Sequence, residues 1–349
     1  MRQIGEYTLL GTHADSDVAP TLIVMDTNVL IDIHDFYFGT RRRRDGLEDL
    51  LTLFPYTRRP SVDINYGWAV GEASWVRGRG YDVTRRRPLA YAAEQVIHWT
   101  KEEIGRAFAS RHPPVSRDRV WPRVSLAREA DMPDPRLFVM PAYGALLYLL
   151  DLRGQTARRR SKGPLWAIEQ YATWTTDVLG VRISAVTAIA VALLAGDDRS
   201  RTEVEGFFAL SGSRDPDELA AKAWNVAWDI MFTQLPEGMS YGLLPTKAPQ
   251  QTVLATRNSD PRVLRRMIDM VAMIDTGETQ IPFTRIDHDV KAGVDDEEVA
   301  RILSLDPGTA LSRFARPPEE VARQAARAVQ ELEVRLGCTV LTSHDGWNL

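Results

Sequence analysis

The alternation of apolar and polar residues predicts an α/β fold that begins with a buried strand. Residues 21–25 (TLIVM) form a continuous run of β-forming residues, the pattern of a strand buried on both faces of a parallel sheet. The polar triplet 26–28 ends this run, and residues 29–33 are apolar again, as in a helix. A second short strand is predicted at 252–255, before the polar segment 256–260. Since ligands of such sheets gather at the carboxyl ends of the strands, both polar segments are candidates for a site.

Apolar residues spaced three and four apart predict helices along much of the remaining chain. We expect helices at Pro60–Trp75, from Pro88 to about Ser110, at Pro141–Leu152, Pro164–Leu179, Ser184–Leu194 and Glu218–Leu235, from Pro261 to about Ile274, and at Pro318–Leu336. The three helices between 141 and 194 are typical of a helical layer. Arg111–Asp134, with its four prolines, is expected to be a long loop, and Cys338–Leu341 a last short strand.

The composition is that of a folded globular protein. The 349 residues are 44% hydrophobic and 26% charged, which excludes a disordered or collagen-like chain. The single cysteine, Cys338, cannot form an internal disulfide and favours a reducing, cytoplasmic setting. The most apolar run, residues 183–196, is shorter than the roughly 20 residues of a membrane span, and residues 1–20 lack the pattern of a signal peptide. We therefore expect a cytoplasmic protein without a membrane segment.

The net charge of −4 conceals a basic N-terminal part. Residues 1–128 carry a net charge of +3 and residues 129–349 a net charge of −7. Arginine supplies 38 of the 43 cationic residues, and its guanidinium group can donate two parallel hydrogen bonds to a phosphate. The cluster Arg41, Arg42, Arg43 and Arg44 is accordingly a candidate nucleic-acid contact, although a solvated loop in an arginine-rich protein is the alternative.

Four carboxylates occur at positions where an α/β fold could bring them together. Asp26 and Asp260 follow the two predicted strands, whereas Glu72 and Asp229 lie in predicted helices with apolar neighbours. An acid in such surroundings is costly unless it is paired or binds a cation. Each also has a structural alternative: a helix N-cap for Asp26, an exposed position for Glu72, an arginine partner for Asp229 and a turn for Asp260.

At these positions the chain resembles the PIN-domain nucleases. The segment 22–31 (LIVMDTNVLI) resembles the opening strand of that family, with Asp26 as the first metal-binding aspartate and Asn28 at the usual Asn position. Glu72 in GEASW fits the second acid, and Asp229 in NVAWDIMF the third. The segment 252–261 (TVLATRNSDP) is similar to the strand that carries the fourth, but Asn258 fills its usual slot. Asp260, two residues later, is an alternative ligand, and Asp345 is a further rival for this place.

The resemblance implies a PIN-like central parallel sheet flanked by helices and a site for Mg²⁺ or Mn²⁺. Asp26, Glu72, Asp229 and Asp260, with Asn258, would be the metal ligands, because hard cations prefer carboxylate and amide oxygens. The implied reaction is hydrolysis of phosphodiester bonds, with RNA as the commonest substrate and Asn28 and Arg41 to Arg44 as nucleic-acid contacts.

The resemblance covers about a third of the chain, and the remainder predicts additions to a PIN-like domain at 1–280. Its core would be about 20–80 and 220–275, with a helical insertion at about 81–219 and a C-terminal extension, 281–349, packed on the core. These additions would select the substrate or hold a partner. Two functional alternatives stay open: a toxin or defence effector controlled by an inhibitory or assembly protein, and an inactive scaffold that binds nucleic acid or a protein.

Overall fold

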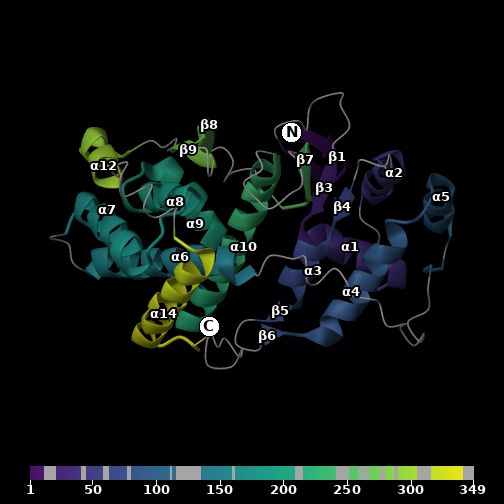
Figure 1. The fold of residues 1–349 in the computed structure, drawn as a ribbon, viewed down its shortest axis with the longest axis horizontal. Coiled ribbons are helices and arrows are strands. Elements are labelled where there is room, and N and C mark those ends of the chain that lie inside the picture. The colour runs from purple at the N-terminus through teal and green to yellow at the C-terminus, as the bar shows by residue number, and fades with distance from the viewer. Residues whose placement is uncertain are drawn as a thin grey trace. The chain divides into compact units, whose positions relative to one another are not determined.

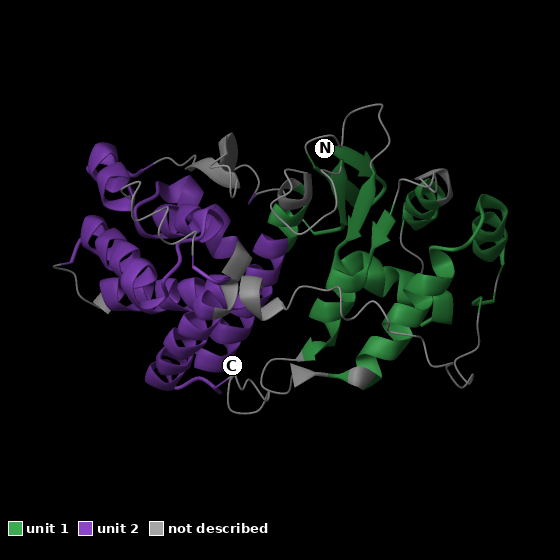
Figure 2. Ribbon diagram, in the orientation of Figure 1, with its two compact units in different colours: residues 1–132, 232–262 green, residues 133–231, 263–349 purple. Residues whose placement is uncertain are grey.

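The chain divides into two compact units in the computed structural model (Figure 2). Unit 1 comprises Met1–Met132 and Phe232–Arg262, and unit 2 comprises Pro133–Met231 and Val263–Leu349. The structure describes residues 1–11, 21–40, 45–57, 63–76, 80–110, 112–114, 135–158, 162–208, 215–240, 251–258, 264, 267–275, 280–286, 290–304 and 316–340.

A five-stranded mixed sheet forms the centre of unit 1 (Figure 1). Its strands, in spatial order, are β1 (Arg2–Ile4), β2 (Tyr7–Leu10), β7 (Thr252–Thr256), β3 (Leu22–Met25) and β4 (Asp63–Asn65). Strand β3 is parallel to both β7 and β4, whereas β2 is antiparallel to β7 and to β1. The α/β class is therefore confirmed, but the sheet is not wholly parallel, because the N-terminal hairpin adds two antiparallel strands beside β7.

Strands β3 and β7 lie, with β2, in the buried part of this sheet. All residues of both strands are buried, as the continuous apolar runs predict. Met25 pairs with Ala255, so the two strands end at the same level of the sheet. The backbone N–H of Asp26 then donates to the Ala255 carbonyl at 2.9 Å. The residues that follow β3 and β7 consequently emerge side by side.

Five helices and a short hairpin complete the described part of unit 1. They are α1 (Thr27–Phe38), α2 (Leu47–Thr57), α3 (Gly67–Ser74), β5 (Trp75–Val76), β6 (Gly80–Tyr81), α4 (Val83–Val96) and α5 (Lys101–Ala109). Helices α1, α3 and α4 pack against one another, and α2 packs against α5 (Figure 1). Phe36 of α1 stacks on Phe108 of α5 with ring centroids 4.2 Å apart, which ties both groups of helices into one core.

Two predicted helices of unit 1 are corrected by the structure. The stretch predicted as one helix at 60–75 contains strand β4 before α3, because β4 pairs with β3, far away in sequence. The helix predicted from Pro88 begins earlier, where the Asp82 side chain accepts hydrogen bonds from two backbone amides. It is also divided in two, since Thr100 and Glu103 form a capping box that starts a new helix, α5.

Unit 2 is mainly helical. Its described elements are α6 (Pro135–Arg158), α7 (Pro164–Thr173), the π-helix η2 (Trp174–Val178), α8 (Ser184–Leu194), α9 (Asp198–Phe208), most of α10 (Pro216–Ser240), β8 (Ile268–Asp275), β9 (Gln280–Ile286), α12 (Asp296–Leu303) and α14 (Pro318–Leu336). Helices α8 and α14 have the predicted bounds. Helix α14 packs along α6, where the Tyr143 hydroxyl donates to the buried carboxylate of Glu333 at 2.7 Å.

Other predictions for unit 2 differ from the structure. The helix expected at 261–274 is instead largely strand β8, whose antiparallel partner β9 follows it in a hairpin. Residues 338–340, part of the expected last strand, are irregular. Most of the expected loop at 111–134 lies outside the described residues. Helices α4 and α5 pack within unit 1, and α14 packs with α6 in unit 2, while the predicted division into core, insertion and extension stays a prediction.

None of the helices in the described part of the chain has both the length and the apolar character needed to span a membrane.

Candidate functional site

Asp26 lies at the carboxyl edge of the sheet, directly after β3. The residue is 3% exposed and occupies the N-cap position of α1, where its carbonyl accepts the first helical hydrogen bonds. Its side chain, however, makes no capping hydrogen bond. The alternative of a helix N-cap is thus confirmed for the position of Asp26, and its carboxylate has further partners as well.

Those partners are a hydroxyl and an amide. The Thr256 hydroxyl, at the end of β7, donates to Asp26 Oδ2 at 2.5 Å, and the Asn28 amide donates to the same oxygen at 3.4 Å. The backbone N–H of Asn258 in turn donates to the Thr256 hydroxyl oxygen at 2.9 Å. The predicted site residues Asn28 and Asn258 are thus brought to the carboxylate of Asp26, with Thr256 as the link.

Glu72 reaches the same place from helix α3. This helix follows β4, and the Asn65 side chain accepts a hydrogen bond from the Gly67 amide at its first turn. The Thr27 hydroxyl, next to Asp26, donates to Glu72 Oε2 and lies 3.3 Å from the Ala69 carbonyl oxygen. Because β3 and β4 are parallel neighbours, the helices that follow them start at the same edge of the sheet, which brings the two acids together.

Burial raises the proton affinity of both carboxyl groups, and the charge of Asp26 adds to the effect at Glu72. Burial and then the charge of Asp26 raise the pKa of Glu72 to about 8, against a smaller opposing effect of its hydrogen bond from Thr27. Burial likewise raises the pKa of Asp26, and the hydrogen bonds from Thr256 and Asn28 partly offset this rise. Within the described part of the chain, no Lys, Arg or His side chain forms an ion pair with either acid.

A second buried acid of α1, Asp32, has a different environment. It is 5% exposed and accepts hydrogen bonds from the Tyr7 hydroxyl at 3.0 Å and from Arg257 Nε at 2.9 Å. Burial, followed by the charge of Asp32, raises the pKa of Tyr7, so this phenol remains protonated and serves as a donor. The polar segment 256–260, already a candidate from the sequence, contains Thr256 and Arg257, but the sequence indicated neither Asp32 and Tyr7 nor the partners that Thr256 and Arg257 bind.

The remaining predicted site residues are not joined to this pair by the structure. Asp229 is half-buried on α10 in unit 2, whereas Asp26 and Glu72 belong to unit 1, so its role as a third ligand stays a prediction. Asp260, Asp345 and the cluster Arg41, Arg42, Arg43 and Arg44 lie outside the described residues. A group of three or more His, Cys, Asp and Glu side chains suited to a metal ion is not present among the described residues.

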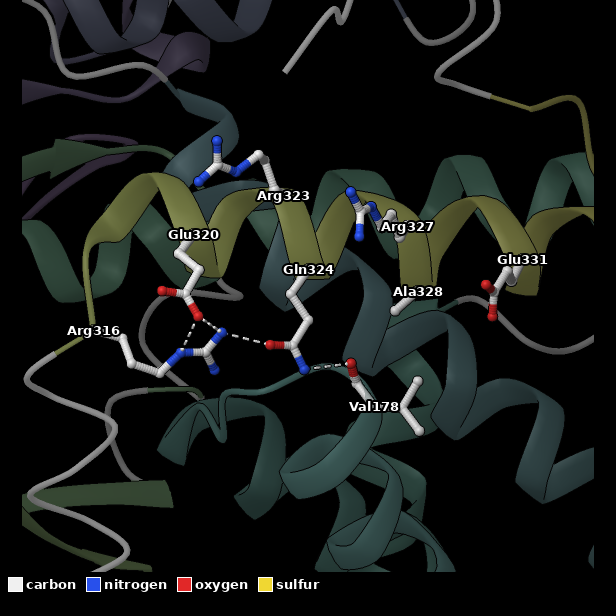
Figure 3. A pocket seen from close by; sticks show the side chains of 8 residues that line it. All are labelled: Val178, Arg316, Glu320, Arg323, Gln324, Arg327, Ala328 and Glu331. Carbon is white, nitrogen blue, oxygen red and sulfur yellow. Dashed lines mark hydrogen bonds and ion pairs between the residues drawn. The ribbon is translucent and has the colours of Figure 1, made fainter.

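A cavity of about 340 Å³ lies in unit 2, over one face of α14 (Figure 3). Arg316 donates to Glu320 and Gln324, and the Gln324 amide donates to the Val178 carbonyl at 2.9 Å. Arg323 points away from this network (Figure 3). The lining contains none of the predicted site residues, and its arginine and glutamate side chains balance one another to a large extent.

Comparison with known proteins does not assign this arrangement: no protein-family model, curated protein or solved structure matches the chain. The candidate site is therefore defined by geometry alone. It consists of Asp26 and Glu72, oriented by Thr256 and Thr27, with the two asparagines beside them. The arrangement brings two desolvated carboxyl groups near enough for the charge of Asp26 to raise the pKa of Glu72.

Proposed function

We propose that this chain is a PIN-like, metal-dependent nuclease in which Asp26 and Glu72 bind Mg²⁺ or Mn²⁺. The observation that carries the proposal is the pair of desolvated carboxyl groups without a cationic partner among the described residues. Two like charges in such surroundings destabilise the fold unless a proton or a cation separates them. A divalent cation is the partner that would allow both groups to remain ionised at neutral pH.

The donor atoms at the site suit these metals. Asp26 and Glu72 offer carboxylate oxygens, and the amide oxygens of Asn28, whose Nδ2 donates to Asp26, and of Asn258, whose backbone N–H donates to Thr256, are proposed as further ligands. Mg²⁺ and Mn²⁺ prefer oxygen ligands, and Mg²⁺ usually keeps several waters beside one or two carboxylates. Asp229 and Asp260 are proposed as further ligands, with Asp345 as the rival of Asp260.

When bound, such a metal would polarise a phosphodiester and lower the pKa of an attacking water. The chain itself would provide orientation. The Thr256 hydroxyl donates to Asp26 and itself accepts a hydrogen bond from the backbone N–H of Asn258, and the Thr27 hydroxyl donates to Glu72. RNA is the proposed substrate, and Arg41 to Arg44 would contact its backbone. The chain would act in the cytoplasm as a toxin or defence effector, and a protein partner would control its activity.

One observation favours the alternative of an inactive PIN-like scaffold. Asn258 stands beside Thr256 where the resemblance calls for an aspartate, and an amide contributes no charge to a metal site. A scaffold would bind nucleic acid or a protein without cleaving a substrate.

A cleavage assay separates the two functions. The purified chain, Asp26→Asn and the control Glu48→Gln, an exposed acid of α2, would be incubated with labelled RNA and DNA in Mg²⁺, Mn²⁺ or chelator. We expect metal-dependent cleavage by the unchanged chain and the control. Asp26→Asn should lose activity by about 100-fold or more, since several kcal/mol of transition-state stabilisation would be removed. Binding without cleavage would favour the scaffold, and cleavage in chelator would reject the metal mechanism.

A further inference from the structure

Arg257 is held by one edge of its guanidinium group and open at the other. Its Nε donates to the buried carboxylate of Asp32 at 2.9 Å, and its side chain is 27% exposed. Within the described part of the chain, its terminal Nη groups make no hydrogen bond or ion pair. The guanidinium group therefore has the four N–H donors of its two Nη nitrogens left in one plane, the geometry with which arginine binds a phosphate.

Arg257 directly follows the residue that orients Asp26. Arg257 follows Thr256, whose hydroxyl donates to Asp26, and precedes Asn258, whose backbone amide donates to Thr256. The end of β7 thus carries, on consecutive residues, a group that orients Asp26 and a guanidinium group with free donors. Both stand at the sheet edge where β3 and β7 end together.

Asp32 and Tyr7 fix the position of the guanidinium group. Thr8 of β2 pairs with Thr256 of β7, which places Tyr7 beside Arg257 on the neighbouring strand. The Tyr7 hydroxyl and Arg257 Nε both donate to Asp32 Oδ2. A long arginine side chain normally loses much rotamer freedom when it binds a ligand, and this shared carboxylate has already restricted Arg257 before any ligand arrives.

We propose that Arg257 is a phosphate-binding residue of the candidate nuclease site, and that Asp32 and Tyr7 are positioning residues for its guanidinium group. The ligand class is a phosphate of the nucleic-acid backbone. This inference rests on the proposed function and adds the residue that would hold the substrate near the acidic pair. The competing explanation is an ion pair that only fastens the end of β7 to α1, with no contact to substrate.

The test is binding of labelled single-stranded RNA and DNA in chelator, measured over a series of salt concentrations. Arg257→Gln removes the guanidinium group, and we expect nucleic-acid affinity to fall by roughly tenfold. The slope of log affinity against log salt concentration should fall by about the amount that one phosphate contact contributes. Arg257→Lys keeps a positive charge for Asp32, but its ammonium group cannot bind Asp32 and a phosphate together. This variant should therefore fold normally and should bind nucleic acid as weakly as Arg257→Gln does. Arg153→Gln, which breaks a half-exposed pair with Glu205, is the matched control and should bind as the unchanged chain does.

The outcomes are distinguishable. The inference would be overturned if Arg257→Lys bound nucleic acid with unchanged affinity and salt dependence. It would also be overturned if both variants bound more weakly with an unchanged salt dependence, because that result indicates a purely structural role for Arg257. A raised KM with little change of kcat in Mn²⁺ would support a substrate contact, whereas a lowered kcat alone would contradict it. If the unchanged chain neither binds nor cleaves nucleic acid, the proposed function itself fails, independently of Arg257.

Discussion

Asp26 and Asp32 are both buried, six residues apart along the start of α1, and only Asp32 has a cationic partner among the described residues. Arg257 and Tyr7 donate to Asp32, so its charge is compensated within the chain. Among the described residues, Asp26 receives neutral donors alone, among them the Thr256 hydroxyl and the Asn28 amide, and a second acid, Glu72, is its neighbour. The negative charge of Asp32 is thus compensated within the fold, whereas Asp26 belongs to an acidic pair whose negative charge is not compensated by a described residue.

This difference separates a stabilising acid from an acid retained at a cost. A buried carboxylate with an arginine partner holds two segments together, and loss of either member leaves the other charge unpaired. A pair of desolvated carboxyl groups opposes folding whenever both are ionised, and it becomes favourable when a cation is supplied from outside the chain. Asp26 and Glu72 are therefore the acids whose replacement should harm function more than stability.

The largest expected contrast is in stability without metal. Asp32→Asn should lower the free energy of unfolding by about 2–3 kcal/mol, because Arg257 would lose its charged partner and Tyr7 a charged acceptor. Asp26→Asn should not lower it, because removal of one charge relieves the repulsion with Glu72. Urea unfolding of both variants in chelator measures the contrast. Equal destabilisation by the two substitutions would show that Asp26 is also a structural acid.

A smaller effect is expected from pH. Because folding raises the pKa of Glu72 to about 8, the folded chain binds this proton more tightly than the unfolded chain does. In the metal-free protein, the contribution of Glu72 to stability should consequently be largest below the ordinary pKa of glutamate and should fall as the pH rises toward 8, by at most about 1.4 kcal/mol per pH unit.

Glu72→Gln provides the matched control for that prediction. It should flatten the decline between pH 5 and 8 measured by thermal unfolding in chelator, because the amide has no proton to release. Added Mn²⁺ should have the same flattening effect on the unchanged chain, since metal binding requires the deprotonated carboxylates. A decline that persists in Glu72→Gln would assign the pH dependence to other groups.

The features of this site that depend on neighbouring residues could be predicted from the sequence. The features that depend on the pairing of strands far apart in the chain could not. The apolar run before Asp26 indicated a buried strand followed by a helix, and the structure has β3 and α1 there. Thr256 and Arg257 act on residues 230 and 225 positions away, through the pairing of β7 with β3 and β2. No local pattern of apolar residues encodes such a register.

The same limit explains the errors in the fold. Strands β4 and β8 were predicted as parts of helices because short apolar segments fit both periodicities, and the deciding partner strands lie outside those segments. Helices α8 and α14 have the predicted bounds because their patterns are long or uniformly apolar and their ends carry their own signals, such as Pro318 at the start and Gly337 after the end of α14.

The most direct measurement is the binding of Mn²⁺ at pH 8 by calorimetric titration. The chain itself, Asp26→Asn, Glu72→Gln and the control Glu48→Gln would be compared. If Asp26 and Glu72 share a cation, the unchanged chain and the control should bind Mn²⁺ with equal affinity, and each substitution at the pair should weaken it by at least about tenfold. Equal affinity in all four proteins, or no Mn²⁺ binding by the unchanged chain, would contradict the assignment of this pair as a metal site.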